Sequence, residues 1–180
     1  MFDRSRNFFR HFAAGIMVRK EVKLNTPYEI SLQNIWKDIH HCIVCWPEDG
    51  IDVMAAELVF RKLRNRFQFS AITVIALPGL GASPPDFGID LFEIGADEFT
   101  FFGAPNGNLK FRLKNLKADL AVDLSPEYNP LSAYCCAASG ARIRIGFATA
   151  EDDLVFNVQI APNQDRSGID RYRVLATYIG

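Results

Sequence analysis

The stretch Val44-Cys-Trp-Pro-Glu-Asp-Gly-Ile-Asp-Val-Met54 marks the point where a predicted strand leads into a predicted helix. The short apolar run 42–46 is β-prone, and apolar residues then recur at helical spacing, which predicts a helix over 52–66. In open α/β sheets, ligands bind at such junctions beyond the carboxyl ends of the strands. Asp52 lies in this junction and is therefore the first candidate for a functional side chain.

Asp52 has two roles open to it. A carboxylate at a helix N-terminus accepts backbone N–H bonds and interacts favourably with the helix dipole, which contributes about 0.5–2 kcal/mol. Position alone favours this capping role. The same carboxylate can instead act as a base toward a bound hydroxyl group. Glu48 and Asp49 compete for the same cap, and their spacing does not choose among the three acids.

Strands and helices alternate through the rest of the chain, which is typical of a parallel sheet covered by helices. A short helix within 24–39 is expected to lead into the first strand. The other predicted strands lie at 71–77, 89–94, 98–102, 119–124, 142–147 and 154–160, and the other predicted helices at 109–116, 129–139 and 166–179. This order predicts a single Rossmann-like, three-layer α/β domain over 26–180 with a mostly parallel sheet.

The first 25 residues are expected to form a separate helical arm. Residues 1–20 place apolar side chains at spacings of three and four among five Arg and Lys residues, which predicts a basic amphipathic helix. Such a helix can pack on its own domain or on a second subunit. The alternative is that residues 1–20 contact an anionic membrane surface.

Composition limits the classes of function. The chain has 180 residues, of which 49% are hydrophobic, and a net charge of −1, so nothing in its overall charge favours nucleic acid as a partner. Its four cysteines lie in apolar segments, which indicates a reducing compartment. We therefore expect a cytoplasmic protein, or one peripheral to the inner membrane if the arm contacts lipid, and we find no signal peptide or membrane-spanning segment in the sequence.

Metal and cofactor sites are not expected. His40, His41, Cys42 and Cys45 are of ligand type, but Cys42 and Cys45 face opposite sides of a strand and no second pair lies at ligand spacing. Phosphate-binding loops, nucleophile elbows and metalloprotease motifs are absent from the sequence.

A second group of polar residues follows the buried strand 119–124, on the edge of a parallel sheet where Asp52 also lies. These candidate ligand-binding residues, together with Glu48 and Asp49, are Asp123, Ser125, Glu127 and Asn129. They can line a polar crevice with Asp52. Equally, Asp123 and Ser125 can serve only to bond turn amides before Pro126.

Four segments resemble one enzyme family, the ADP-heptose:lipopolysaccharide heptosyltransferases of glycosyltransferase family 9. Val44 to Phe67 is similar, without a gap, to the opening strand and helix of that family, and Asp52 falls on the family's Asp. The later segments 118–125, 132–147 and 170–180 are similar to a strand, a segment ending in Arg-x-Gly, and the helix that closes the first domain. The resemblance covers roughly residues 42–180.

The resemblance implies half of a two-domain glycosyltransferase of the GT-B fold. In that family the first domain binds a lipid-sugar acceptor and supplies the Asp as general base, and the second binds the nucleotide sugar. Only the first is matched, so we expect no donor site. Asp52 becomes the candidate general base, although Ile51 replaces the family's glycine and Pro47-Glu48-Asp49 its Ser-rich loop.

Three functions remain open. The leading hypothesis is a binding or interaction module that takes a sugar or a lipid-linked sugar and is inactive alone. The first alternative is a transferase that acts with a donor-binding domain on another chain. The second is a homodimeric scaffolding protein.

Overall fold

A computed structural model of the chain describes residues 15–22, 35–47, 50–68, 71–77, 89–101, 104–149, 155–161 and 168–180, with the backbone alone at 50–52 and 168. Six strands form one sheet in the order β3-β2-β1-β4-β5-β6, and every neighbouring pair is parallel. The strands are β1 (His41–Cys45), β2 (Ala71–Ala76), β3 (Asp90–Glu93), β4 (Leu120–Asp123), β5 (Ile143–Phe147) and β6 (Val158–Ile160). This is the Rossmann strand order, so the predicted fold class is confirmed.

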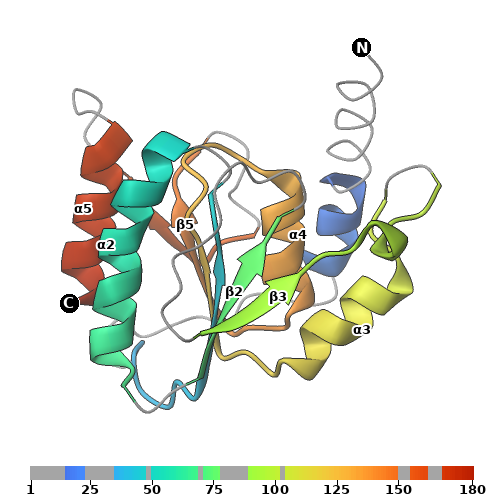
Figure 1. Ribbon diagram of the computed structural model, residues 1–180, viewed down its shortest axis with the longest axis horizontal. Coiled ribbons are helices and arrows are strands. Elements are labelled where there is room, and N and C mark those ends of the chain that lie inside the picture. Colours follow the sequence, from blue (N-terminus) through green and yellow to red (C-terminus); the bar gives the residue numbers. More distant parts are fainter. Residues whose placement is uncertain are drawn as a thin grey trace.

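Helices cover both faces of this sheet (Figure 1). One face is covered by α2 (Gly50–Arg66) and α5 (Gly168–Ile179), which pack side by side. The other face is covered by α3 (Gly107–Asn115), α4 (Pro130–Ala138) and the helical residues 15–22. Two separate clusters of buried apolar side chains result, one on each face. Cys42 belongs to the first and Cys45 to the second, as expected for residues three apart in a strand.

The opening unit forms because its sequence suits burial on both sides. β1 lies in the middle of the sheet, and its residues from Cys42 to Cys45 are fully buried. In α2, Ala56, Phe60 and Leu63 are spaced by four and three residues and point into the same cluster. The Trp46 ring meets Phe60 edge to face, with their centroids 6.1 Å apart.

The strand predicted over 98–102 is wrong for the residues that the structure describes. Ala96–Glu98 form a 3₁₀ turn, and Phe99 makes only an isolated bridge to Pro105. The cause is the Glu98 carboxylate, which accepts the Gly95 N–H at 2.9 Å and pairs with the Arg112 guanidinium at 2.6 Å. These contacts hold the backbone in a turn.

Two other predicted elements are shorter than expected. β6 begins at Val158, because the Asn157 side chain bonds the β5 backbone: its Oδ1 accepts the Arg144 N–H at 2.8 Å and its Nδ2 donates to the Arg142 carbonyl at 2.7 Å. Before β1, residues 35–38 form a turn with Asp38 at φ 58°, not a helix, and residues 23–34 lie outside the described part.

Only the last part of the predicted arm is described. Residues 15–22 are helical, and Val18, Glu21 and Val22 are buried against the domain. Whether the chain divides at residue 25 stays a prediction. Among the described residues, no helix combines the length and apolar character needed to cross a bilayer.

Candidate functional site

The two candidate segments leave the sheet at the same edge. β1 and β4 are parallel neighbours, and the last residue of β1, Cys45, lies opposite Asp123, the last residue of β4. Asp52 is the third residue of α2, the helix that follows β1, so its backbone lies at this carboxyl edge. Its side chain, like Glu48 and Asp49 as a whole, lies outside the described part, so its roles as base or cap stay predictions.

Asp123 anchors the turn that follows β4. Its Oδ1 accepts the Ser125 backbone N–H at 2.9 Å, and its Oδ2 accepts the hydroxyl of Ser132. The Ser132 hydroxyl also lies 3.1 Å from the Asn129 carbonyl oxygen and 3.5 Å from Ser125 Oγ. Asp123 is only 4% exposed, so this carboxylate serves the loop from below.

Asn129 begins the helix that follows this turn. Its Oδ1 accepts the N–H groups of Leu131 at 3.0 Å and Ser132 at 3.3 Å, and Pro130 occupies the first helical position. An Asn cap followed by Pro is a favoured start for a helix, because the side chain satisfies amides that the helix leaves unbonded. Among the candidate residues after β4, the structure thus brings Asp123, Ser125 and Asn129 together in one buried network.

Glu127 differs from those three residues because its side chain is exposed. It lies in the same turn, between Ser125 and Asn129. Among the described candidates it is therefore the carboxylate that a soluble ligand can reach directly.

The last helix of the chain also holds this turn. The Tyr172 hydroxyl donates to the Leu124 carbonyl at 2.8 Å, and an Arg171 Nη1–H donates to the Pro126 carbonyl. Sequence reasoning missed both residues, since they come from a helix 45–48 residues further along and no motif links them to β4. It also missed Ser132, for which the Asn129-Pro130 helix start is an available signal.

A group of thiols lies beneath the site. Cys45 Sγ and Cys136 Sγ are 3.7 Å apart, and both residues are fully buried. Burial raises the pKa of the Cys42 thiol, while hydrogen bonding to neighbouring thiols, followed by burial, raises the pKa of Cys45 and Cys136. These thiols stay protonated, so they are poor nucleophiles. Within the described residues, no group of three His, Cys, Asp or Glu side chains could hold a metal ion.

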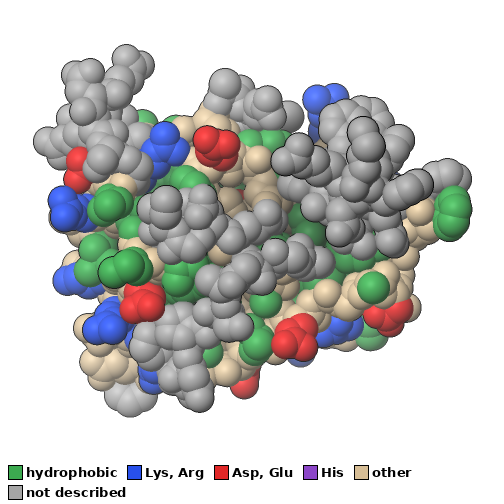
Figure 2. All heavy atoms as spheres, turned by 45° about the horizontal axis from the view of Figure 1, so that its top comes forward, with side chains coloured by type: hydrophobic (Ala, Val, Ile, Leu, Met, Phe, Trp, Pro, Cys, Tyr) green, Lys and Arg blue, Asp and Glu red, His purple; other side chains and the backbone are tan. Residues whose placement is uncertain are grey.

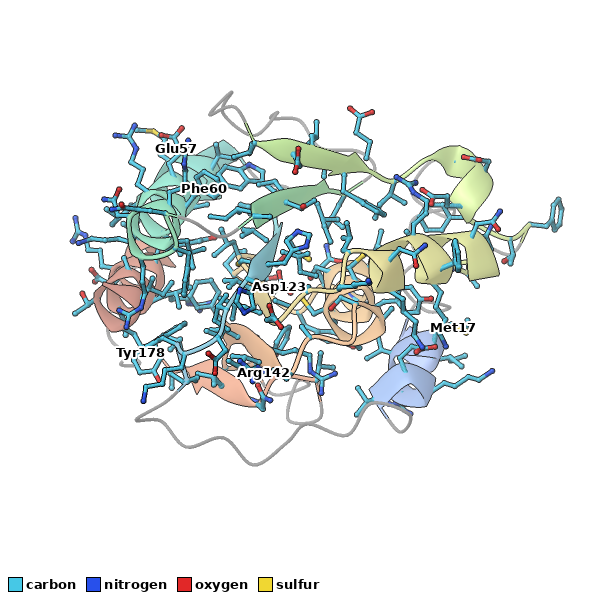
Figure 3. The ribbon with its side chains drawn as sticks, turned by 90° about the horizontal axis from the view of Figure 1, so that it is seen from below. Met17, Glu57, Phe60, Asp123, Arg142 and Tyr178 are labelled. Carbon is cyan, nitrogen blue, oxygen red and sulfur yellow. The ribbon has the colours of Figure 1, made fainter. Side chains whose placement is uncertain are left out.

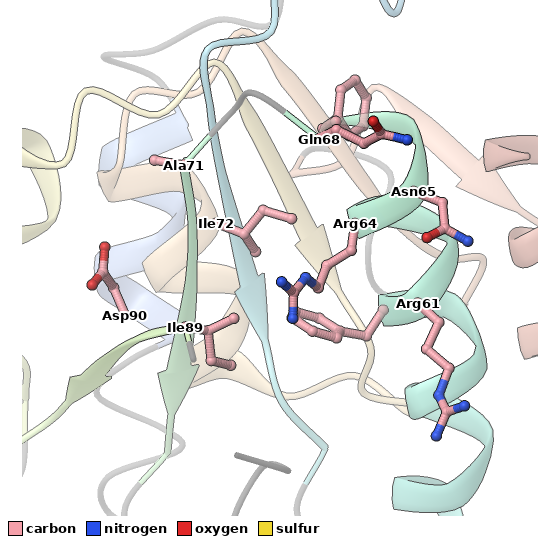
Figure 4. A pocket seen from close by; sticks show the side chains of 10 residues that line it. Arg61, Arg64, Asn65, Gln68, Ala71, Ile72, Ile89 and Asp90 are labelled. Atoms are coloured by element: carbon pink, nitrogen blue, oxygen red, sulfur yellow. The ribbon is translucent and has the colours of Figure 1, made fainter. Parts of the chain in front are cut away.

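A groove of about 700 Å³ lies at the opposite edge of the sheet. It runs between the second half of α2 and the first residues of β2 and β3, with Phe60 and Ile72 in its floor and Arg61, Arg64 and Asp90 at its rim (Figure 4). Because these strand residues lie at the amino edge, the groove is separate from the site described above.

Comparison with known proteins points to one class. No protein-family model matches this chain, and neither does any curated protein. Among solved structures, the chain is similar to the crystal structure of the glycosyl transferase family 9 from Veillonella parvula DSM 2008, with a TM-score of 0.56 and 16% sequence identity. The match covers 78% of this chain and 41% of that one, so this chain spans about two fifths of its length. At this identity the likeness shows the fold.

Proposed function

We propose that these 180 residues form an acceptor-side domain of the heptosyltransferase-like kind, which binds a sugar-containing ligand of the lipopolysaccharide core type at the carboxyl edge of its sheet. Transfer requires a nucleotide-sugar-binding domain outside these residues, so by themselves they act as a binding module. The observation that carries the proposal is the parallel pairing of β1 with β4, which brings the first turn of α2 beside the β4–α4 turn.

The geometry of the β4–α4 turn supports a preorganised binding wall. Four side chains bond its backbone or its anchoring carboxylate: Asn129, Ser132, Arg171 and Tyr172. A loop held in this way loses little conformational entropy when a ligand binds, which favours affinity. Glu127, exposed on this wall, can accept hydrogen bonds from sugar hydroxyl groups.

The similarity to a glycosyltransferase family 9 structure supports the ligand class, since the matched part carries the Rossmann-like domain with Asp52 at its opening junction. An Asp at this position can accept the proton of an acceptor hydroxyl when a donor sugar is supplied. This favours, as a second candidate, a transferase that uses a donor-binding domain of another chain. It shares the acceptor site with the binding module and differs from it only in turnover.

The test is a binding screen by calorimetry with lipid-core sugars and ADP-sugars, on the natural chain and on Asp52→Ala and Glu127→Gln. Asp90→Ala is the matched control, because Asp90 is an exposed acid at the amino edge of the same sheet. We expect a core sugar to bind the natural chain and the control equally, and the two site variants at least fivefold more weakly. Equal binding by all four proteins would overturn the assignment.

Two further measurements separate the alternatives. Sugar transfer from an ADP-sugar, after addition of a separate donor-binding domain, would show the second candidate. If no sugar binds and light scattering gives a dimer, the homodimeric scaffold replaces both.

A further inference from the structure

The surface formed by residues 15–22, α3 and the segment 96–105 exposes large apolar side chains. Phe101 is 99% exposed, Phe111 on α3 is 67% exposed and Ile16 is 57% exposed. Single exposed apolar residues are common on proteins, but two phenylalanine rings at such exposure are not needed by the fold. Figure 2 shows an apolar side chain projecting at the right-hand edge, where this segment lies.

The segment that carries Phe101 is well anchored. Thr100 N–H bonds the Ala104 carbonyl at 2.8 Å, and the Asn106 N–H bonds the Glu98 carbonyl at 2.8 Å. The Asn106 Nδ2 donates to the Asp97 carbonyl at 2.7 Å. The exposure of Phe101 is thus a built feature of a closed turn.

These elements belong to one end of the molecule. Lys110 on α3 pairs with Glu21 of the helix 15–22, with Nζ and Oε1 2.5 Å apart and the Glu21 carboxylate buried. Figure 3 places both helices and the turn at the end opposite α2 and α5, with Met17 labelled between the two helices. We call the outer side of this group the α3 surface.

The α3 surface is basic. α3 contains three bases and no acid, and residues 15–22 contain two bases and only Glu21, which is already paired. Asp97 is an exposed acid nearby, and Lys117 adds a further base after α3. The exposed bases without an ion pair among the described residues are Arg19, Lys20, Lys114 and Lys117.

The opposite end of the molecule has a different surface. Met54 and Leu58 on α2 are also exposed, at 81% and 40%, but acids and bases alternate with them, as Figure 2 shows at the left. Glu57 pairs with Arg61 there, and Asp170 pairs with Arg173. Charge therefore distinguishes the two ends more than apolar exposure does.

We propose that the α3 surface docks on a lipid bilayer that contains anionic lipids. Aromatic rings are favourable at headgroup depth, and each Lys or Arg near an anionic surface adds attraction. Phe101 and Phe111 enter the interface, while Arg19, Lys20 and Lys114 lie against lipid phosphates. This contact is peripheral and does not depend on the ligand bound at the carboxyl edge.

The test uses the full chain and vesicles of phosphatidylcholine, with or without about one third phosphatidylglycerol, in sedimentation at low and physiological salt. We expect binding only to the anionic vesicles, weakened by salt. Phe101→Ala with Phe111→Ala, and separately Lys20→Glu with Lys114→Glu, should each lower the partition coefficient about tenfold. Met54→Ala with Leu58→Ala is the matched control and should leave it unchanged.

A tryptophan reporter identifies the surface directly. Phe101→Trp should shift its emission to the blue on addition of anionic vesicles, whereas Met54→Trp should not. Absence of sedimentation overturns the proposal. Sedimentation without a shift at position 101, or with equal losses in the control pair, also overturns it, because another surface or segment then carries the contact.

Discussion

Ser132 and Asp123 tie the first turn of α4 to the end of β4: the Ser132 hydroxyl donates to Asp123 Oδ2, and both side chains are buried. The bond joins two elements that meet at the candidate site, so its loss should be felt both in stability and in the shape of the turn.

Replacing Ser132 with Ala should lower the free energy of unfolding by about 1–3 kcal/mol, because a buried carboxylate loses one donor. Urea unfolding measures the change. Thr177→Ala is the matched control, since its hydroxyl bonds the Arg173 carbonyl on an exposed face of α5. If both variants lose the same small amount, the Ser132–Asp123 bond does not stabilise the turn.

Tyr172→Phe removes the hydroxyl that donates to the Leu124 carbonyl and keeps the ring, which packs edge to face on Phe147 with centroids 5.0 Å apart. We expect a loss of about 1–2 kcal/mol, because a buried carbonyl loses its donor. Thermal unfolding checks this against Tyr178→Phe, whose hydroxyl bonds no described residue. An unchanged melting temperature for Tyr172→Phe would contradict the expected loss.

Gly146→Ala should destabilise the fold by about 1–3 kcal/mol through overpacking. A Cβ at this position would lie 2.8 Å from the Phe156 ring, closer than packed atoms approach. Gly107→Ala is the opposite case: nothing lies within 4 Å, and the residue opens α3, so the same change should be neutral or stabilise slightly. Chemical unfolding of both variants would refute the packing argument if they responded alike.

The buried thiols predict an alkaline loss of stability. Burial raises the pKa of Cys42 far above its ordinary value of 9.0, so the folded thiol keeps its proton while the unfolded one ionises. Its contribution is fully present below pH 9 and falls as pH rises above it, by about 1 kcal/mol between pH 9 and 10.

Urea unfolding across this pH range measures the slope. Cys42→Ala should be less stable at every pH because it leaves a cavity, but its stability should fall less steeply above pH 9. Equal slopes for the two proteins would contradict the assignment of the alkaline loss to Cys42.

Much of the fold could be predicted from local sequence. The run Cys42 to Cys45 is apolar throughout because its strand is covered on both faces, and such strands read as continuous apolar segments. The failures have local causes of another kind. Asn157 ends β6 early with its side chain, and Glu98 turns the chain with a bond to Gly95 and a pair with Arg112.

For the candidate site, the sequence alone determined which polar residues follow which strands, because strand period and the strand-to-helix order are properties of neighbouring residues. Only the tertiary structure decided what those residues do. Asp123 is engaged below the turn because Ser132, on the next helix, reaches it, and Tyr172 reaches the same turn from α5. Such contacts join segments far apart in the chain, so they depend on how the layers pack and not on any local pattern.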